Sequence, residues 1–252
     1  MLVSLTTSAI PAALLLTVGV LLGEPWQRPI WLVAVLYDVA VIFITSRGGG
    51  GWVVSSAAHF AERHALVVLL ALGESMVAIG AGAAQGVISL PVVGAAVVAL
   101  AVAIGVWLHY FLGLADRLEH GLASLTGAER ARAARDVFTY LHLPIVGGII
   151  LAALGIEQSL AHLGSGHVGT LGSWALGGGL ALSLAGMAVA DRRIGGRWSP
   201  WRIGAVAALL IGAALLPSVH PTLALGVVAV VLIASGVADA VTRAPQTDAT
   251  HR

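Results

Sequence analysis

The stretch that decides the fold runs from His59 to Gly80 and reads HFAERHALVVLLALGESMVAIG. Most of its residues are apolar, and at about 1.5 Å of rise per residue a helix of this length crosses a hydrocarbon core of about 30 Å. We therefore expect a transmembrane helix here. It has one unusual feature, because Glu62, Arg63 and Glu74 interrupt its apolar residues.

The composition of the whole chain agrees with this interpretation. Of its 252 residues 58% are hydrophobic and 10% are charged, and the mean hydropathy is +0.97. A soluble domain carries about 25% charged residues, so the lipid bilayer is expected to be the main partner of this surface. The net charge of +1 argues against a nucleic-acid partner. The absence of cysteine from the sequence excludes disulfides, thiolate catalysis and iron–sulfur ligation.

Seven further apolar segments are separated by polar residues, glycine or proline. With the first they predict an all-α, polytopic transmembrane bundle of about eight spans, forming one domain over residues 1–243. The expected spans lie near residues 3–22, 30–46, 59–80, 91–113, 137–156, 172–190, 203–217 and 221–240. The first segment has no basic region before it and is expected to be retained as a helix. A short helix is expected near 126–135, and the polar tail 244–252 is expected to be disordered.

The arginines predict the orientation of the spans. All 13 basic residues are arginine, and eight spans place Arg28 alone on one side and the other twelve on the opposite side. Positively charged loops of membrane proteins lie predominantly in the cytoplasm. Both termini are therefore expected to be cytoplasmic.

Ionisable residues within the spans are the candidate functional residues, because each costs about 2.5–3.5 kcal/mol at the centre of a spanning helix. Helical spacing places His59, Arg63 and Glu74 on one stripe of the third span, with Glu62 beside it. Arg63 and Glu74 are about 16 Å apart along the axis, so each needs a partner from another helix.

Three residues on other spans are candidate partners. Asp38 lies midway along the second span, His109 lies near the cytoplasmic end of the fourth, and His142 lies just inside the fifth. We expect the seven residues to form a buried polar network or a transport path. Glycines in these spans, among them Gly147 and Gly148, are expected to permit close packing of helices; the others are Gly73, Gly80 and Gly177 to Gly179.

The third span resembles the bacterial low temperature requirement protein A (LtrA) family, in which a Glu-Arg pair is followed by an aliphatic run that ends in Gly-Glu. The resemblance continues with Trp107-Leu-His-Tyr-Phe111 and with Tyr140-Leu-His-Leu-Pro-Ile-Val-Gly-Gly-Ile-Ile. Members usually begin with a helix that carries a Glu-Leu-Phe-Phe-Asp-Leu motif, which this sequence lacks, so no function requiring that helix is implied. The resemblance implies a multi-pass protein of the bacterial inner membrane, but no particular reaction.

Three classes of function remain open from the sequence. A proton-linked transporter or channel for a small solute would use the carboxylates and histidines as protonatable groups. A structural or stress-adaptation protein without turnover would use the same charges as helix–helix pairs. A membrane-embedded enzyme that binds zinc or haem would need His59, Glu62, His109 and His142 at one site. The first class is favoured, with no cofactor expected, no catalytic residue assigned and the oligomeric state undetermined.

Overall fold

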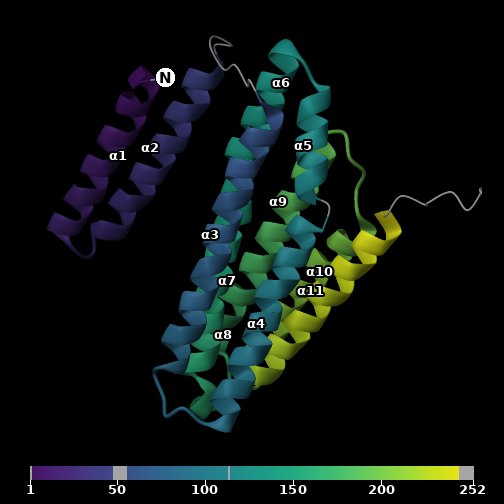
Figure 1. Ribbon diagram of the computed structural model, residues 1–252. Coiled ribbons are helices and arrows are strands. Elements are labelled where there is room, and N and C mark those ends of the chain that lie inside the picture. Colours follow the sequence, from purple (N-terminus) through teal and green to yellow (C-terminus); the bar gives the residue numbers. More distant parts are fainter. Residues whose placement is uncertain (1, 48–55, 113, 244–252) are drawn as a thin grey trace, which may run out of the picture. The chain divides into compact units, whose positions relative to one another are not determined.

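The computed structural model describes residues 2–47, 56–112 and 114–243, and every regular element in these ranges is a helix (Figure 1). The contacts divide the chain into two compact units, residues 1–53 and 54–252, which we describe separately. A single domain over 1–243 thus remains a prediction, and the expected disordered tail lies outside the described residues.

The first unit is a hairpin of two helices, α1 (Leu2–Leu22) and α2 (Gln27–Arg47). Two side chains of α2 donate hydrogen bonds to backbone carbonyls of α1. The indole Nε1 of Trp31 donates to Leu16 at 3.1 Å, and the Tyr37 hydroxyl donates to Thr7 at 2.9 Å. Aromatic groups with one polar atom can pack in an apolar interface when that atom finds such a partner. These bonds therefore fix how the two helices pack.

The second unit begins with α3 (Ala57–Ala83) and α4 (Leu90–Phe111), followed by the short α5 (Leu114–Ser124). A long helical segment then consists of α6 (Gly127–Ala133), a π-helix η1 (Ala134–Tyr140) and α7 (His142–Ala161). After a 3₁₀ turn at Leu163–Ser165, the chain continues through α8 (Gly169–Ser173), a second π-helix η3 (Trp174–Gly178) and α9 (Gly179–Arg193). The last helices are α10 (Pro200–Leu215) and α11 (Pro221–Arg243).

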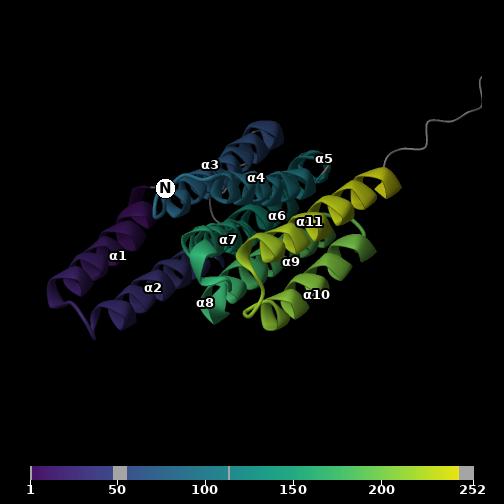
Figure 2. The same cartoon turned by 90° about the horizontal axis from the view of Figure 1, so that it is seen from below.

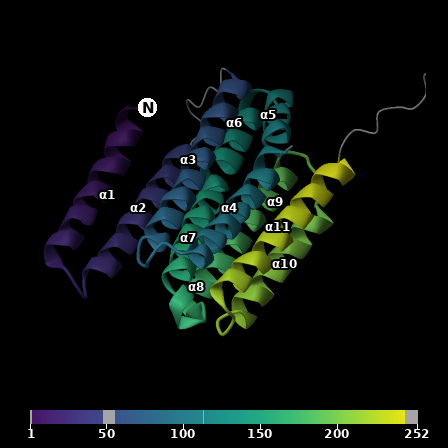
Figure 3. The same cartoon turned by 60° about the horizontal axis from the view of Figure 1, so that its bottom comes forward.

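Packing in this unit follows five main helix pairs. Helix α3 packs against α7, α4 against α11, and α7 against α9 (Figure 3). Helix α10 lies beside both α9 and α11 (Figure 2). The core contains aliphatic side chains from each of these helices, including Val68, Val106, Ile149, Leu184 and Leu232.

Each of the eight expected segments coincides with a helix, but eight membrane spans are not confirmed. Among the described residues, five helical segments are long and apolar enough to cross a membrane: Ala57–Ala83, Leu90–Ser124, Gly127–Ala161, Gly169–Arg193 and Pro221–Arg243. Two shorter apolar helices are Ala9–Leu22 and Pro200–Leu215. The short helix expected near 126–135 is confirmed as α6 with the start of η1.

Close packing of α7 on α9 depends on glycine. A Cβ atom built on Gly148 would overlap the Gly179 carbonyl oxygen and would lie 2.6 Å from the Ser183 nitrogen, both backbone atoms of the next helix. A Cβ on Gly179 would lie 2.7 Å from the Gly148 oxygen, and one on Gly177 would lie 2.8 Å from the Leu209 oxygen of α10, as expected for close packing. At Gly178 a Cβ would meet only the Trp174 ring, at 3.4 Å. The same expectation is wrong for Gly73, Gly80 and Gly147, where a Cβ would meet open space.

Adjacent glycines of α7 should therefore respond oppositely to alanine. We expect Gly148→Ala to lower the free energy of unfolding by about 1–3 kcal/mol, because the backbone of α9 must move. Gly147→Ala should leave it unchanged or raise it by roughly 0.5–1 kcal/mol, because alanine favours the helix and meets no neighbour. Thermal unfolding of both variants in one detergent tests this contrast, and equal midpoints would contradict it.

Candidate functional site

The polar residues predicted on the third span lie on the outer face of α3. His59, Glu62, Arg63 and Glu74 are all exposed, whereas the buried face of this helix consists mainly of small residues. Two of these side chains lie near each other, with His59 Nδ1 3.9 Å from Glu62 Oε2 and both side chains about 70% exposed. Asp38 is half-buried in the first unit. The structure therefore does not bring Glu74 together with His109 or His142.

The other two predicted residues, His109 and His142, are buried inside the second unit. His142 is 5% exposed, and its Nε2 atom lies 2.9 Å from the hydroxyl of Tyr110 on α4, which is 1% exposed. His142 Nδ1 lies 2.9 Å from the carbonyl oxygen of Val137. Both nitrogens of this buried imidazole thus have a hydrogen-bond partner.

These partners determine the tautomer of His142. A carbonyl oxygen can only accept, so Nδ1 carries the hydrogen and donates it to Val137. In the neutral ring Nε2 then has a lone pair, and the Tyr110 hydroxyl donates to it. The pair can take up one proton at Nε2 and keep its hydrogen bond, since the hydroxyl can rotate and accept instead.

The π-helix η1 creates the position of His142. The backbone nitrogen of Leu141 donates to Asp136 O, five residues earlier, instead of to the Val137 oxygen that an α-helix would use. The Val137 carbonyl is therefore available to the His142 ring. Single π-helical turns inside α-helices occur frequently at functional sites.

Two further aromatic rings lie against His142. The Phe138 ring stacks on it with centroids 5.4 Å apart and an interplanar angle of 15°, and His64 of α3 meets it edge-on at 5.2 Å. His64 is half-buried, and its Nδ1 donates to the Phe60 carbonyl at 2.8 Å, which leaves Nε2 of the neutral ring as an acceptor. We refer to His64, Tyr110, Phe138 and His142 as the His–Tyr cluster.

His109 makes a separate connection beside this cluster. Its Nε2 lies 3.1 Å from the hydroxyl of Ser235 on α11, and that hydroxyl also donates to the Val231 carbonyl. The hydroxyl has one hydrogen, so His109 Nε2 is the donor in the first bond. The carbonyl oxygen of His109 accepts a hydrogen bond from Arg202 at 3.3 Å. His109 therefore links α4 to α10 and α11.

A cluster of five charged side chains lies near His109, and we call it the ion cluster. Asp191 at the end of α9 receives two parallel hydrogen bonds from Arg117 of α5, at 3.1 and 3.2 Å. It also bonds Arg243 of α11 at 2.8 Å and lies 3.5 Å from Arg202. Asp239 of α11 pairs with Arg202 at 2.9 Å and with Arg243 at 2.6 Å.

Burial decides what this cluster contributes. Asp191 and Arg202 are each 1% exposed, so their charges have left water at a cost of several kcal/mol per ion, which only well-placed partners offset. Three arginines surround two carboxylates, which leaves one net positive charge. The ion cluster ties together the ends of α5, α9, α10 and α11 on the side that we call the arginine-rich end, where Arg192, Arg193 and Arg197 also lie.

Reasoning from the sequence missed most of these residues. Arg117, Arg202 and Arg243 served only to orient the spans, and Asp191 and Asp239 were not selected, although each is a carboxylate within an apolar helix. His64 and Tyr110 stand in the quoted motifs but were not predicted as site residues. A search for acidic residues within a few positions of a span end could have found both aspartates.

The donor set for a metal is not assembled. His59 and Glu62 lie on the exposed face of α3, whereas His109 and His142 are buried and hydrogen-bonded elsewhere. Over residues 2–47, 56–112 and 114–243, no three histidine, aspartate or glutamate side chains are placed to hold a metal ion.

Long apolar helices and buried charge pairs near their ends define a polytopic helical membrane protein. The chain belongs to the bacterial low temperature requirement A protein (LtrA) family, whose model matches residues 1–237. The match extends well beyond the quoted motifs that carry the resemblance in the sequence. The chain is also similar to the uncharacterized protein RA0937 of Rhizobium meliloti (strain 1021), with 36% identity over 108 residues. These residues are 41% of this chain and a quarter of the relative. No solved structure matches.

Proposed function

We propose that this protein is a proton-linked transporter or channel of the bacterial inner membrane, in which His142 takes up and releases the proton. The observation that supports this proposal is the buried hydrogen bond between Tyr110 and His142. Ionisable groups inside a membrane bundle are expensive and usually mark a path for ions or protons. His142 has a hydrogen-bond partner at each ring nitrogen and keeps both when it is protonated at Nε2.

The neighbours of His142 support each step of proton uptake. Protonation at Nε2 turns the imidazole into a cation, and the face of the stacked Phe138 ring can stabilise that charge. Tyr110 changes from donor to acceptor at the same atom pair. His64 is half-buried next to His142 and has a free acceptor nitrogen in its neutral form, which makes it the group through which the proton arrives.

The arginines support the orientation in this proposal. With both termini in the cytoplasm, the arginine-rich end faces the cytoplasm, and the His–Tyr cluster lies in the cytoplasmic half of the spans. Glu74 then lies about 15 Å further along α3, beyond the reach of this cluster. A role for Glu74, Asp38 and the other residues of the predicted stripe in the transport path stays a prediction.

Proteoliposomes test the proposed function. We expect the protein to conduct protons under an imposed potential, or to drive uptake of a labelled small solute from a panel of amino acids, sugars and organic acids under a pH gradient. His142→Gln should reduce this signal to that of empty liposomes. His162→Gln is the matched control, because His162 is the residue following α7, bonds a carbonyl in the same way and is exposed. No signal from the unmodified protein in either assay would contradict the proposal.

The ion cluster favours a second function, a structural protein of the membrane without turnover. Its charges are paired with one another, as expected of groups that hold helices together. Under this alternative His142→Gln changes stability at most, and the unmodified protein shows neither proton flux nor gradient-driven uptake. The same liposome experiment therefore separates the two functions.

A further inference from the structure

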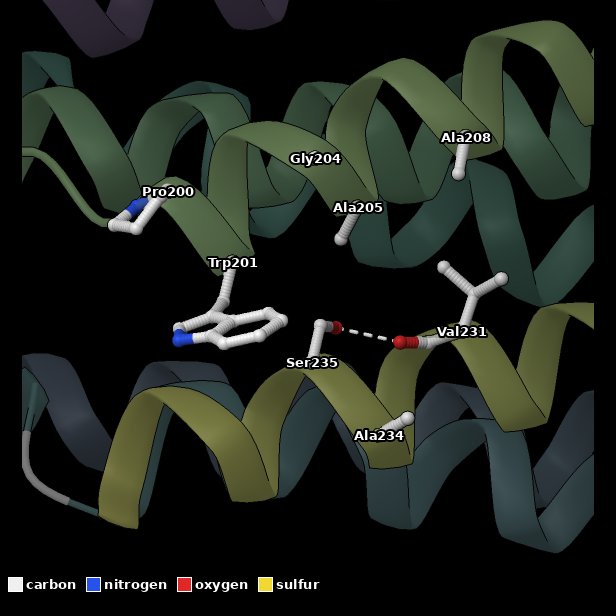
Figure 4. Close-up of a pocket in the computed structure, with 8 residues that line it drawn as sticks. All are labelled: Pro200, Trp201, Gly204, Ala205, Ala208, Val231, Ala234 and Ser235. Carbon is white, nitrogen blue, oxygen red and sulfur yellow. Dashed lines mark hydrogen bonds between the residues drawn. The ribbon is translucent and has the colours of Figure 1, made fainter. Parts of the chain in front are cut away.

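A groove of about 500 Å³ runs between α10 and α11 on the outside of the second unit. Figure 4 shows its lining, in which Gly204, Ala205 and Ala208 of α10 face Ala234 and Ser235 of α11. The indole of Trp201 lies at the end nearest the start of α10. Small side chains on both helices leave this space open.

The lining offers an occupant one hydrogen-bonding group, the indole nitrogen of Trp201 at one end of the groove. Its one side-chain hydroxyl, that of Ser235, donates to the Val231 carbonyl and accepts from His109 Nε2 (Figure 4 shows the first bond). The remaining lining groups are apolar, apart from the indole nitrogen of Trp201. An occupant of the groove itself is therefore a hydrocarbon.

Two apolar occupants can be compared by their size: a third helix and a single extended alkyl chain. Packed helices are about 8–10 Å apart between their axes, and a helix with side chains is about 10–12 Å across. Because α10 and α11 pack against each other, a third helix cannot enter between them. A single extended alkyl chain can. The surrounding exposed residues, such as Ile203, Leu210 and Val230, are those of a lipid-facing surface.

The charge at one end of the groove indicates the head group of this lipid. Trp201 belongs to the first turn of α10, and the exposed Arg197 lies just before that turn. The carbonyl of Arg197 accepts a hydrogen bond from Arg243, so the loop is tied to the ion cluster, which carries one net positive charge. Within the described residues the Arg197 side chain has no carboxylate partner, and the exposed Trp198 beside it suits a membrane interface.

We propose that the groove binds one acyl chain of an anionic phospholipid, whose phosphate is held by Arg197. Basic sites between transmembrane helices on the cytoplasmic side bind anionic head groups. Each arginine near the membrane surface raises the affinity about fivefold. This site is separate from the His–Tyr cluster, so it stands whether or not the protein moves protons.

Fluorescence quenching by brominated lipids tests this proposal, because Trp201 lines the groove. The purified protein is reconstituted with phosphatidylcholine that contains increasing amounts of brominated phosphatidylglycerol or brominated phosphatidylcholine. We expect brominated phosphatidylglycerol to quench the tryptophan fluorescence at about fivefold lower concentration than brominated phosphatidylcholine. This difference should vanish in Trp201→Phe. Arg197→Gln should make the two lipids equal.

Two alanines of α10 give a matched pair of variants. Ala208→Leu fills the groove and should abolish the preferential quenching, whereas Ala207→Leu, on an exposed position outside the lining, should preserve it. Equal quenching by both lipids in the unmodified protein would overturn the proposal. Preferential quenching by phosphatidylglycerol that survives Ala208→Leu would also overturn it. A stable dimer of the purified protein that Ala208→Leu dissociates would do the same, because a second copy would then occupy this face.

Discussion

Replacing Asp191 with asparagine is expected to lower the free energy of unfolding by about 3–5 kcal/mol, the range for breaking a buried ion pair on one side only. Asparagine has nearly the same shape, so the change is one of charge. All three arginines that contact Asp191 would then lose a carboxylate partner, and Arg202 is 1% exposed. Thermal unfolding and size-exclusion chromatography in one detergent measure the effect.

Asp136 is the matched control for this prediction. It also pairs with two arginines, Arg135 and Arg193, but its side chain is 26% exposed. Exposed pairs contribute about 0–1 kcal/mol, so Asp136→Asn should cost much less than Asp191→Asn. Equal losses in the two variants would show that burial does not decide the effect.

A second substitution should partly rescue Asp191→Asn. Adding Arg202→Met removes one buried positive charge and replaces it with an apolar chain, which restores the balance of one excess positive charge. We expect the double variant to unfold at a higher temperature than Asp191→Asn alone. A double variant that is less stable than the single one would contradict the charge-balance explanation.

Replacing Tyr110 with phenylalanine is expected to reduce proton-linked transport by about tenfold or more while the fold is kept. The ring remains in place, and only the hydroxyl that bonds His142 Nε2 is lost. A buried hydrogen bond whose partner is left unsatisfied costs about 1–3 kcal/mol, and each 1.4 kcal/mol is tenfold in an equilibrium. The protonated imidazole loses more than the neutral one, because hydrogen bonds to charged groups contribute about 1.5–3 kcal/mol and neutral ones about 0.5–1.5 kcal/mol. His142 should therefore take up the proton less readily, and the flux should fall.

Tyr37→Phe provides the comparison for Tyr110→Phe. The Tyr37 hydroxyl also donates one hydrogen bond, to the Thr7 carbonyl within the first unit. We expect flux in Tyr37→Phe to equal that of the unmodified protein. A Tyr110→Phe variant that conducts normally would remove the hydroxyl from the proposed mechanism.

The helices could be predicted from the sequence because apolar runs of about 20 residues leave few alternatives. The number of spans could not, since α10 is only 16 residues long and is among the shorter apolar helices. Helix α5 was missed because it is short and half polar, with Leu114, Leu118 and Leu122 forming its buried face. Which glycines pack tightly depends on where the neighbouring helix lies, and adjacent Gly147 and Gly148 cannot be distinguished by composition.

The candidate site was predictable only in part. His109 and His142 could be selected because a buried histidine in an apolar helix is unusual, and the structure places both inside the bundle. Their partners Ser235 and Tyr110 lie 126 and 32 residues away, which spacing along the chain does not reveal. The stripe on α3 illustrates a further limit, since helical geometry shows that residues share a face but not whether that face is buried.

The protonation of His142 itself tests the proposed mechanism most directly. Nitrogen NMR of the ¹⁵N-histidine-labelled protein in lipid nanodiscs, with His142 assigned by its loss in His142→Gln, reports which ring nitrogens carry hydrogen at each pH. We expect a neutral ring protonated at Nδ1 that gains a second proton at Nε2 within the pH range where the liposomes show flux. A His142 ring that stays neutral throughout that range would contradict its role as the proton carrier.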